Sequence, residues 1–306
     1  MEQVAIIIPC YNRVQTTVSC LHRLRELSLP EFFHIYLVDD GSTDGTVAAV
    51  RTQFPEVRLI EGEGDLYWTG AIELGMRAAF EAGACCFIWL NDDAFVEEGA
   101  IQRVARRADE LGGIASGLGY LVVQKPNHFY TYHFDLLYKG WKALKTVPPD
   151  LSRGEIRVDT CRGNLVAVSR KVVDGIGFPD GRRIPHFGGD TDYGLRATSA
   201  GFSVVVIPAA LVREVKFAQG ESQSWLLGTA SARDLCRSCL RKRHPFYPPA
   251  LLAYSLRHWG FIGLNVFLFK FTKLTAICLV KLLVPRRLLI FLFGRFSYSW
   301  KAVGEG

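Results

Sequence analysis

Pairs of adjacent carboxylates follow two strand-like segments of the chain. Asp92 and Asp93 come after the apolar segment 86–90, and Asn91 precedes them. Two carboxylates at the end of a buried strand repel each other unless a cation or several hydrogen-bond donors compensate. Mg²⁺ or Mn²⁺ takes oxygen ligands and completes its shell with substrate phosphates, so few protein ligands suffice. This turn predicts a metal site beside a diphosphate; an acidic turn that starts the next helix is the alternative.

The second pair, Asp39 and Asp40, lies in the sequence V-D-D-G-S-T-D-G-T at residues 38–46. One acid is enough for a helix cap or a turn, where Asp, Gly and Ser are ordinary residues. Two adjacent acids at a strand end can instead accept hydrogen bonds from the imide N–H of uracil or thymine and from ribose hydroxyls. We therefore expect this pair to bind a nucleoside.

The segments around these acids alternate between apolar runs and amphipathic stretches. Such alternation predicts an α/β fold with a mainly parallel sheet that is buried on both faces. Ligands of such folds bind beyond the carboxyl ends of the strands, where both acidic pairs lie. The expected strands are 5–9, 35–38, 57–60, 85–90, 163–169 and 203–207, and the expected helices are 14–27, one from Ser42 or Thr43, 69–81, 98–111 and 189–200. The aromatic stretch 128–141 is expected to form an inserted hairpin or loop.

Two common nucleotide-binding devices are missing from the sequence. The first expected strand ends in P-C-Y-N-R at 9–13 rather than in a G-x-G-x-x-G turn, and no G-x-x-x-x-G-K-[ST] loop occurs. These absences disfavour a nicotinamide or flavin enzyme and a P-loop nucleotidase, because both use those glycine-rich loops to bind phosphates.

Three segments taken together resemble family 2 glycosyltransferases of the GT-A fold. They are I-I-I-P-C-Y-N-R at 6–13, V-D-D-G-S-T-D-G-T at 38–46 and L-N-D-D at 90–93, and the match covers about the first hundred residues. The resemblance implies a GT-A (nucleotide-diphospho-sugar transferase) fold and a nucleotide-diphosphate sugar donor. The segments 67–70 and 185–186 are similar to rhamnosyltransferase-like members that use deoxythymidine-diphosphate rhamnose, or to members that use uridine-diphosphate hexoses.

The resemblance assigns the nucleotide-binding residues. The acid pair of the family contacts the nucleobase and the ribose, which carries over to Asp39 and Asp40. The backbone around Pro9 and Tyr11 lines the same pocket. Trp68 lies where similar proteins place residues against the nucleotide, so it is expected to stack on a base or sugar or to pack in the core.

The resemblance also assigns the metal ligands. The third residue of the family's metal motif is the usual direct ligand of Mg²⁺ or Mn²⁺, which implies Asp93. Asp92 then faces the ribose or the metal. Asn91 stands where the first acid of the motif usually lies and is expected outside the metal shell.

A third polar segment, G-D-T-D-Y-G-L-R at 189–196, resembles the E-D-x-D-x-x-x-R segment of the family, with Gly189 in place of the first acid. The resemblance makes Asp190 the general base that removes the acceptor hydroxyl proton; a helix N-cap is the alternative. Asp192 is an alternative base or a partner of Arg196, four residues further along the helix. His186 is expected to bind acceptor or metal, or to be a solvated loop residue.

The C-terminal part of the chain differs in charge from the rest. Residues 233–306 contain 13 Lys and Arg against two acids, whereas the preceding residues contain 23 Lys and Arg against 28 Asp and Glu. The acidic body argues against nucleic-acid binding. From residue 245 onward, aromatic and leucine-rich sequence alternates with basic residues, which predicts amphipathic helices that bind a membrane surface through 245–301. A helical subdomain that packs on the catalytic core or in a homodimer is the alternative.

The cysteines and the N-terminus indicate the compartment. The eight cysteines show no disulfide framework spacing, and the sequence begins directly with a strand-like run. We therefore expect a reduced, cytoplasmic protein at the inner face of the cell membrane. The C-x-x-C pair Cys236 and Cys239 lacks a second pair and is expected to be incidental.

These observations predict an inverting, metal-dependent glycosyltransferase that acts on a glycan or lipid-linked acceptor in cell-envelope polysaccharide synthesis. The expected domains are a catalytic domain at 1–232, with a nucleotide-sugar half at 1–115 and an acceptor half at 116–232, and a helical tail at 233–306. Two other hypotheses stay open. One is a polyprenyl-phosphate sugar synthase, whose acceptor needs little help in losing a proton. The other is a non-catalytic module that binds nucleotide sugar or glycan.

Overall fold

The computed structural model describes residues 3–122, 129–131, 134–136, 145–147, 154–214, 231–285 and 287–291. The chain divides into two compact units, Met1–Lys216 and Phe217–Gly306. The first unit contains the mixed sheet and both acidic pairs, and the second contains the three helices that follow residue 231.

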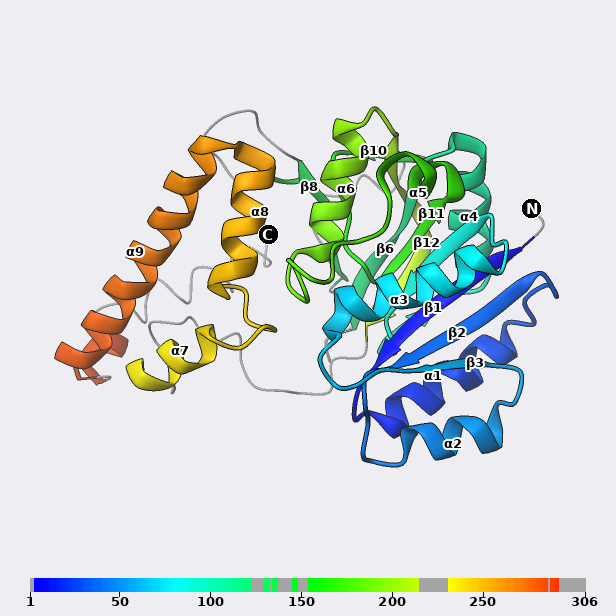
Figure 1. Cartoon of the computed structure of the whole chain (residues 1–306), viewed down its shortest axis with the longest axis horizontal. Coiled ribbons are helices and arrows are strands. Elements are labelled where there is room, and N and C mark those ends of the chain that lie inside the picture. The colour runs from blue at the N-terminus through cyan, green and yellow to red at the C-terminus, as the bar shows by residue number, and fades with distance from the viewer. Residues whose placement is uncertain are drawn as a thin grey trace. The chain divides into compact units, whose positions relative to one another are not determined.

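A mixed sheet forms the centre of the first unit (Figure 1). The order of its main strands is β10-β12-β6-β11-β4-β1-β2-β3, while β5 pairs with β12 and β7 pairs with β6. These strands are β1 (Val4–Cys10), β2 (Phe33–Asp39), β3 (Arg58–Glu61), β4 (Cys86–Leu90), β5 (Ala94–Val96), β6 (Ile114–Val122), β7 (Phe129–Thr131), β10 (Ile156–Val158), β11 (Leu165–Ser169) and β12 (Val204–Glu214). The pairs β4–β1, β1–β2 and β2–β3 are parallel, so the carboxyl ends of these strands meet at one edge.

Helices cover both faces of the sheet. The core on one face includes Leu21, Val50 and Val104, and the core on the other includes Met76 and Tyr193. The helices of the first face are α1 (Val14–Glu26), α2 (Thr46–Gln53) and α4 (Ala100–Leu111), and those of the second are α3 (Tyr67–Glu81), α5 (Arg170–Ile176) and α6 (Gly189–Ser199). This arrangement confirms the expected α/β architecture.

The strand β1 shows why the sheet is buried on both sides. Ile6 and Ile8 belong to one core and Ile7 belongs to the other, and all three are fully buried. Successive side chains of a strand point to opposite faces, so a continuous apolar run fits a sheet that carries helices on both faces.

One boundary difference from the expected elements occurs at the start of α2. This helix begins at Thr46 rather than at Ser42 or Thr43. Gly45 has a φ of 91°, and Asp44 Oδ1 accepts the N–H of Thr46 at 3.1 Å. Because a positive φ interrupts a right-handed helix, residues 40–45 form a loop.

Five elements of the first unit, β5, β6, β9 (Lys145–Val147), β10 and α5, have no counterpart among the expected elements. Strand β12 also runs seven residues beyond the expected end at 207, because it pairs with β6 and β5 there. Within the expected hairpin or loop at 128–141, the described strands are β7 and β8 (Phe134–Leu136), and β8 pairs antiparallel with β9 (Lys145–Val147). The rest of that stretch lies outside the described residues.

The second unit contains three described helices, α7 (Ala232–Cys239), α8 (Pro248–Trp259) and α9 (Phe261–Leu283). Ser231 and Asp234 form a capping box that starts α7. Leu274 and Cys278 of α9 pack with Leu235 of α7, and the thiol sulfurs of Cys236 and Cys278 lie 3.6 Å apart.

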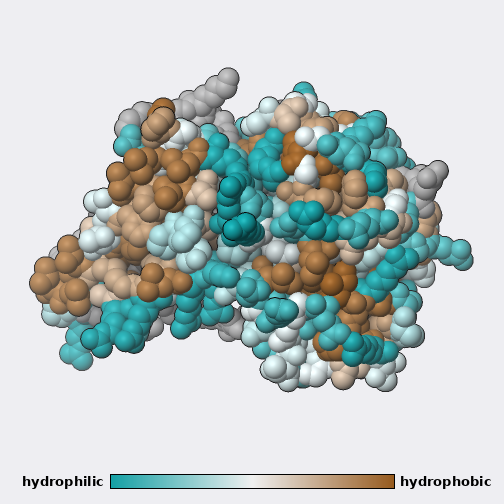
Figure 2. Space-filling view, viewed as in Figure 1, coloured by the Kyte–Doolittle hydropathy of each residue, from teal (hydrophilic) through white to brown (hydrophobic). Residues whose placement is uncertain are grey.

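Many other apolar side chains of α9 are exposed, and Figure 2 shows hydrophobic residues gathered over this helix. Phe261, Phe269, Leu282 and Leu283 are each more than two-thirds exposed. Within the described residues, no helix combines the length and the apolar run that a bilayer-spanning helix requires.

Candidate functional site

The loops after β1 and β2 are tied together by hydrogen bonds. The N–H of Asn12 donates to Ser42 Oγ at 2.7 Å, and the N–H of Thr43 donates to Asn12 Oδ1 at 2.8 Å. Asn12 has a φ of 49°, a conformation that Asn adopts more readily than most residues. With these two hydrogen bonds in place, the neighbouring Tyr11 lies at the surface, with 54% of the residue exposed.

Asp39 lies at the base of this pair of loops and is almost fully buried. Its Oδ2 accepts the N–H of Ser42 at 2.8 Å, and its Oδ1 accepts the thiol of Cys10 at 3.4 Å. Burial, followed by the charge of Asp39, raises the pKa of the Cys10 thiol far above its usual range, so the thiol stays protonated. The Asp39 carboxylate therefore connects the end of β1 to the loop after β2.

Asp40 organises the segment that leads into α3. Its Oδ1 accepts the N–H groups of Gly64 and Leu66 at 3.0 Å each, and its Oδ2 accepts the N–H of Tyr67 at 2.8 Å. Tyr67 has a φ of 56°, which is strained for a bulky residue. The three hydrogen bonds to one buried carboxylate hold this strained turn in place.

The turn after β4 is neutralised by an arginine from the loop after β1. Arg13 Nη1 donates to Asp92 Oδ1 at 2.8 Å, and Arg13 Nη2 donates to Asp93 Oδ2 at 2.9 Å. Asp92 Oδ2 accepts the hydroxyl of Thr17 at 3.1 Å. Burial raises the pKa of Asp92 to about 6, although the positive charge of Arg13 opposes this rise.

Asn91 joins the acidic turn to two other segments. Its Oδ1 accepts the indole N–H of Trp68 at 2.7 Å, and its Nδ2 donates to Asn164 Oδ1 at 2.8 Å. The Trp68 ring also contacts Trp89 edge to face, with centroids 5.8 Å apart, and a Cβ at Gly163 would clash with it. Trp68 is therefore packed at the junction of α3, β4 and the segment that precedes β11.

The segment before α6 lies against the start of α3. The N–H of Thr69 donates to Pro185 O at 2.9 Å, and the N–H of Trp68 contacts His186 Nδ1 at 3.4 Å. A Cβ at Gly189 would lie 2.0 Å from Thr69 Oγ1. Thr69 thus fills the space that a side chain at position 189 would need, which explains the glycine where the family resemblance led us to expect an acid.

Asp190 lies in the first turn of α6 and is half-buried. Its Oδ2 accepts the N–H of Gly163 at 2.9 Å, and its Oδ1 accepts the N–H of Thr191 at 2.7 Å. Gly163 precedes Asn164, the partner of Asn91, so Asp190 and the acidic turn are linked through one short segment. The carboxylate oxygens are held in a fixed orientation.

Asp192 and Arg196 lie on the inner side of α6. Asp192 is 1% exposed, and its Oδ2 is 3.8 Å from Arg196 Nη1. The Arg196 guanidinium also donates to the carbonyls of Ile176 and Phe178. Arg196 therefore connects α6 by hydrogen bonds to the end of α5 and to the loop that follows α5.

The residues present fit a divalent cation that a substrate helps to bind. Within the described part of the chain, no three His, Cys, Asp or Glu residues are grouped so as to form a complete metal shell. Asp93 is one-third exposed, and its Oδ1 has no hydrogen-bond partner among the described residues. Mg²⁺ and Mn²⁺ commonly bind one or two carboxylates and take their remaining ligands from water and substrate phosphates.

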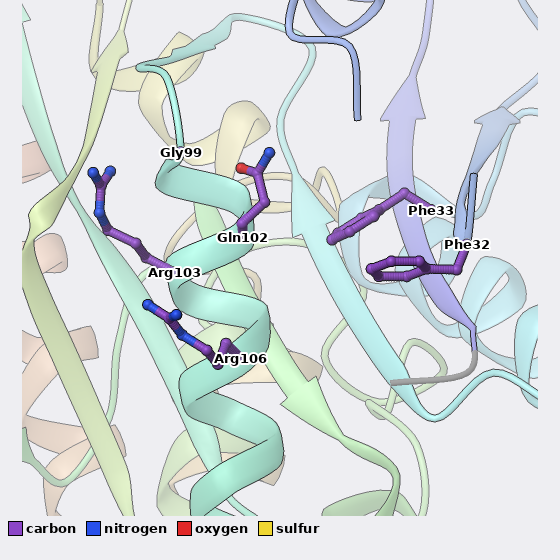
Figure 3. Close-up of a pocket in the computed structure, with 6 residues that line it drawn as sticks. All are labelled: Phe32, Phe33, Gly99, Gln102, Arg103 and Arg106. Atoms are coloured by element: carbon purple, nitrogen blue, oxygen red, sulfur yellow. The ribbon is translucent and has the colours of Figure 1, made fainter. Parts of the chain in front are cut away.

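A surface pocket of about 350 Å³ lies elsewhere in the first unit. Its lining residues, Phe32, Phe33, Gly99, Gln102, Arg103 and Arg106, include none of the expected site residues. Figure 3 shows the two phenyl rings pointing towards α4 and the guanidinium groups pointing away from the rings. Among the residues that the structure describes, no hydrogen bond joins a lining residue of this pocket to the acidic turn.

Arg13, Asn164 and Thr69 are among the residues that contribute to the site without a role assigned from the sequence. Arg13 neutralises the acidic turn, Asn164 holds Asn91, and Thr69 packs against Gly189. The sequence contains a signal for Arg13, because an acid pair at a buried strand end requires a compensating positive charge and Arg13 follows an adjacent strand. The other two depend on contacts between segments distant in sequence.

Comparison with known protein families identifies the chain. The model of the family described as "Glycosyl transferase family 2" matches residues 5–173, more than half of the sequence. The chain belongs to this family. No curated protein sequence matches it.

Solved structures share the fold of this family 2 glycosyltransferase at low sequence identity. The mannosyltransferase PcManGT from Pyrobaculum calidifontis in complex with GDP-Man and Mn²⁺ is 19% identical over 93% of this chain and 82% of its own, with a TM-score of 0.52. S. aureus TarS 1–349 in complex with UDP-GlcNAc is 16% identical over 88% and 76%, with a TM-score of 0.53. GalNAc-T7 with UDP, GalNAc and Mn²⁺ is 15% identical over 74% and 46%, with a TM-score of 0.56. This chain thus spans under half of the GalNAc-T7 chain. The likeness to these structures confirms the expected GT-A fold.

Proposed function

We propose that this glycosyltransferase transfers a sugar, with inversion, from a nucleotide-diphosphate sugar to a glycan or lipid-linked acceptor, using Mg²⁺ or Mn²⁺. One observation carries the proposal. The segment Gly163–Asn164 donates to Asp190 at 2.9 Å and accepts from Asn91 at 2.8 Å, so an oriented carboxylate and the acidic turn share one support. A base on one side of a reacting carbon and a diphosphate-binding turn on the other are what a direct displacement needs.

The nucleoside is assigned to the loops after β1 and β2. Pro9 and Tyr11 lie at the end of β1, and the exposed ring of Tyr11 is available for contact with a base or ribose. Asp39 contributes hydrogen-bond acceptors at the base of these loops. Asp40 contributes by holding the backbone of residues 64–67, and Trp68 follows this backbone as part of the pocket wall.

The diphosphate is assigned to the acidic turn. Asp93 would hold the metal ion, with Asp92 behind it. When bound, such an ion neutralises negative charge on the departing diphosphate. The half-exposed Arg13 guanidinium lies at the same place and offers hydrogen bonds to phosphate oxygens.

Asp190 is assigned as the general base. It accepts the proton of the acceptor hydroxyl while the hydroxyl oxygen bonds to the anomeric carbon and the bond to the diphosphate breaks. The hydrogen bonds from Gly163 and Thr191 orient the carboxylate for this transfer. Asp192 and Arg196 support α6 from within, and the exposed His186 is assigned to contact the acceptor.

The acceptor is assigned to a membrane surface because of the second unit. The exposed apolar side chains of α9 include Phe269, Leu282 and Leu283, and Lys273 is exposed on the same helix. Burial of these apolar side chains at the headgroup boundary, together with attraction of basic residues to anionic lipids, fits a helix that lies in the membrane interface. We therefore place the enzyme at the inner face of the cell membrane as a peripheral protein. The apolar face can alternatively join two copies in a homodimer.

A donor panel with Mn²⁺ or Mg²⁺ tests the proposed reaction. Uridine-, guanosine- and deoxythymidine-diphosphate sugars are incubated with membrane extract, and the released nucleoside diphosphate is measured. The comparisons do not support the rhamnosyltransferase-like subtype, so deoxythymidine-diphosphate rhamnose is one arm of the panel rather than the expected donor. We expect Asp93→Ala to abolish turnover, and Asp190→Asn to lower it by about 100-fold or more while donor binding is kept.

The matched control is Asp174→Asn, which removes an exposed carboxylate of α5 that pairs loosely with Arg170 at 4.0 Å. Its turnover should equal that of the unmodified enzyme. Near-normal activity of Asp190→Asn would refute a base role for this residue and would favour a phosphate acceptor, which needs little help in losing a proton. Donor binding without turnover on any acceptor would favour a binding module.

A further inference from the structure

Arg13 contacts both acids of the turn to which we assign the metal. Its two terminal nitrogens bond to Asp92 at 2.8 Å and to Asp93 at 2.9 Å. The side chain of Asp92 is 3% exposed, whereas that of Asp93 is 33% exposed. One guanidinium therefore bridges a buried carboxylate and a carboxylate that solvent reaches.

The two halves of this bridge differ in how easily they can be exchanged. The Asp92 carboxylate has few other hydrogen-bond donors to turn to, because it is buried with Thr17 and Arg13 as its side-chain partners. A buried charge that loses its partner is strongly unfavourable. The bond to Asp93 lies at the surface, where ion pairs contribute little. Arg13 can thus release Asp93 and keep its bond to Asp92.

A divalent cation that bound Asp93 in the absence of a substrate would meet the positive charge of Arg13. Repulsion between the cation and the neighbouring Arg13 guanidinium disfavours binding of the metal. A diphosphate changes the balance, because its oxygens are good acceptors for a guanidinium and its negative charge offsets both cations. The arrangement therefore favours entry of the metal and the diphosphate together over entry of the metal alone.

We propose that Arg13 is an internal counter-ion that makes metal binding depend on the nucleotide. In the donor-free enzyme it occupies Asp93, and when donor and metal bind it transfers that hydrogen bond to the diphosphate. Arg13 is then a positioning residue with two alternative partners. The inference rests on the proposed metal-dependent function of the same turn.

The test measures Mn²⁺ binding to the full chain by water-proton relaxation, which distinguishes protein-bound Mn²⁺ from Mn²⁺ on free nucleotide. Titrations are made without nucleotide, with UDP, with GDP and with dTDP. For the unmodified protein we expect one of the nucleotides to tighten Mn²⁺ binding by about tenfold or more. For Arg13→Gln we expect Mn²⁺ binding without nucleotide to be about tenfold or more tighter, because the competing charge is gone.

Two further variants make the test specific. Arg13→Lys keeps the charge, so its Mn²⁺ affinity without nucleotide should stay within about threefold of the unmodified protein, even though lysine cannot bridge two carboxylates as a planar fork. Arg51→Gln removes an arginine from an exposed pair with Glu61 and should change nothing. Thermal unfolding of each variant identifies any that fails to fold. If Arg13→Gln does not fold, a tenfold or greater tightening of nucleotide-free Mn²⁺ binding in Arg13→Lys would still refute the counter-ion role, because that variant keeps the charge.

The outcomes separate the inference from the proposed function. If Mn²⁺ binds the unmodified protein only with nucleotide and binds Arg13→Gln without it, the inference stands. If Arg13→Gln and the unmodified protein bind Mn²⁺ equally without nucleotide, or if Arg13→Lys behaves as Arg13→Gln does, the counter-ion role is wrong while the metal site remains. If the unmodified protein binds no Mn²⁺ with any of the three nucleotides, the proposed metal-dependent function itself is overturned.

Discussion

The indole N–H of Trp68 donates to Asn91 Oδ1 at 2.7 Å. On its other side, the same amide donates to Asn164 at 2.8 Å. An amide can accept and donate at once, whereas an ionised carboxylate can only accept. This double use gives a physical reason for an asparagine at the first position of the acidic turn.

We predict that Asn91→Asp does not add a metal ligand and destabilises the fold. The new carboxylate would face Asn164 Oδ1, so the variant should lose about 1–3 kcal/mol of unfolding free energy. Urea unfolding measures the loss, and Mn²⁺ titration in the presence of nucleotide should give an unchanged affinity. A clearly tighter metal affinity would show instead that position 91 reaches the ion.

The three hydrogen bonds that Asp40 accepts predict a local effect of its removal. Asp40→Asn would place an amide N–H₂ against some of the N–H groups of Gly64, Leu66 and Tyr67, at a cost of about 1–3 kcal/mol in unfolding free energy. Hydrogen exchange should accelerate at these three amides, and nucleotide binding should weaken because the loop loses its strained form. The control is Glu63→Gln, an exposed residue of the same loop, which should leave exchange unchanged.

Asp92 predicts a pH dependence of stability in the metal-free protein. Burial raises its pKa from 3.8 to about 6. Its contribution to stability is therefore fully present below pH 3.8 and is lost as the pH rises through 6. Asp92→Asn lacks this loss, so between pH 4.5 and 7.5 it should gain ~2 kcal/mol relative to the unmodified protein. Urea unfolding in EDTA at several pH values measures the difference, and parallel curves for the two proteins would contradict the prediction.

The exposed face of α9 predicts binding to anionic vesicles. Leu282→Glu should lower the partition onto phosphatidylglycerol-containing vesicles by about tenfold or more, because a buried Leu contributes about 1.5–3 kcal/mol. Salt should weaken binding of the unmodified protein, since basic residues take part. Co-sedimentation measures both effects.

Leu240→Glu is the matched control for that experiment, because Leu240, directly after α7, is 72% exposed and Leu282 of α9 is 69% exposed. Its vesicle binding should equal that of the unmodified protein. A dimer in light scattering that dissociates in Leu282→Glu, with no vesicle binding by either protein, would assign the face to a second copy of the chain.

Much of the first unit could be predicted because local and tertiary signals agree there. The expected helix at 14–27 differs from α1 (Val14–Glu26) by one residue, since its apolar positions repeat with helical period. The expected start of α2 differs from the observed one because Ser42 and Thr43 are typical helix-cap residues. In the structure they form hydrogen bonds with Asn12 in the loop after β1 instead. Strands such as β5 and β10 contain only three residues each, which is too short for a periodic pattern.

The site was predictable as a set of residue types and less so as a set of contacts. The positions of the acid pairs at strand ends follow from the alternating pattern alone. The partner of each acid does not, because Arg13 and Asp92 are 79 residues apart in sequence. The roles of Asp93 and Asp190 stay predictions that the experiments above address.

The seam between residues 3–93 and the segments around β11 and α6 bears on how such enzymes can be recombined. Segments that we assign to the donor lie within the first stretch, and Asp190 lies within the second. Several contacts cross the seam, among them Asn91 with Asn164, Thr69 with Gly189 and Glu73 with Gly181, and strand β4 pairs with β11 along it. A chimera that exchanges one stretch for that of a relative must therefore carry compatible residues at all of these contacts.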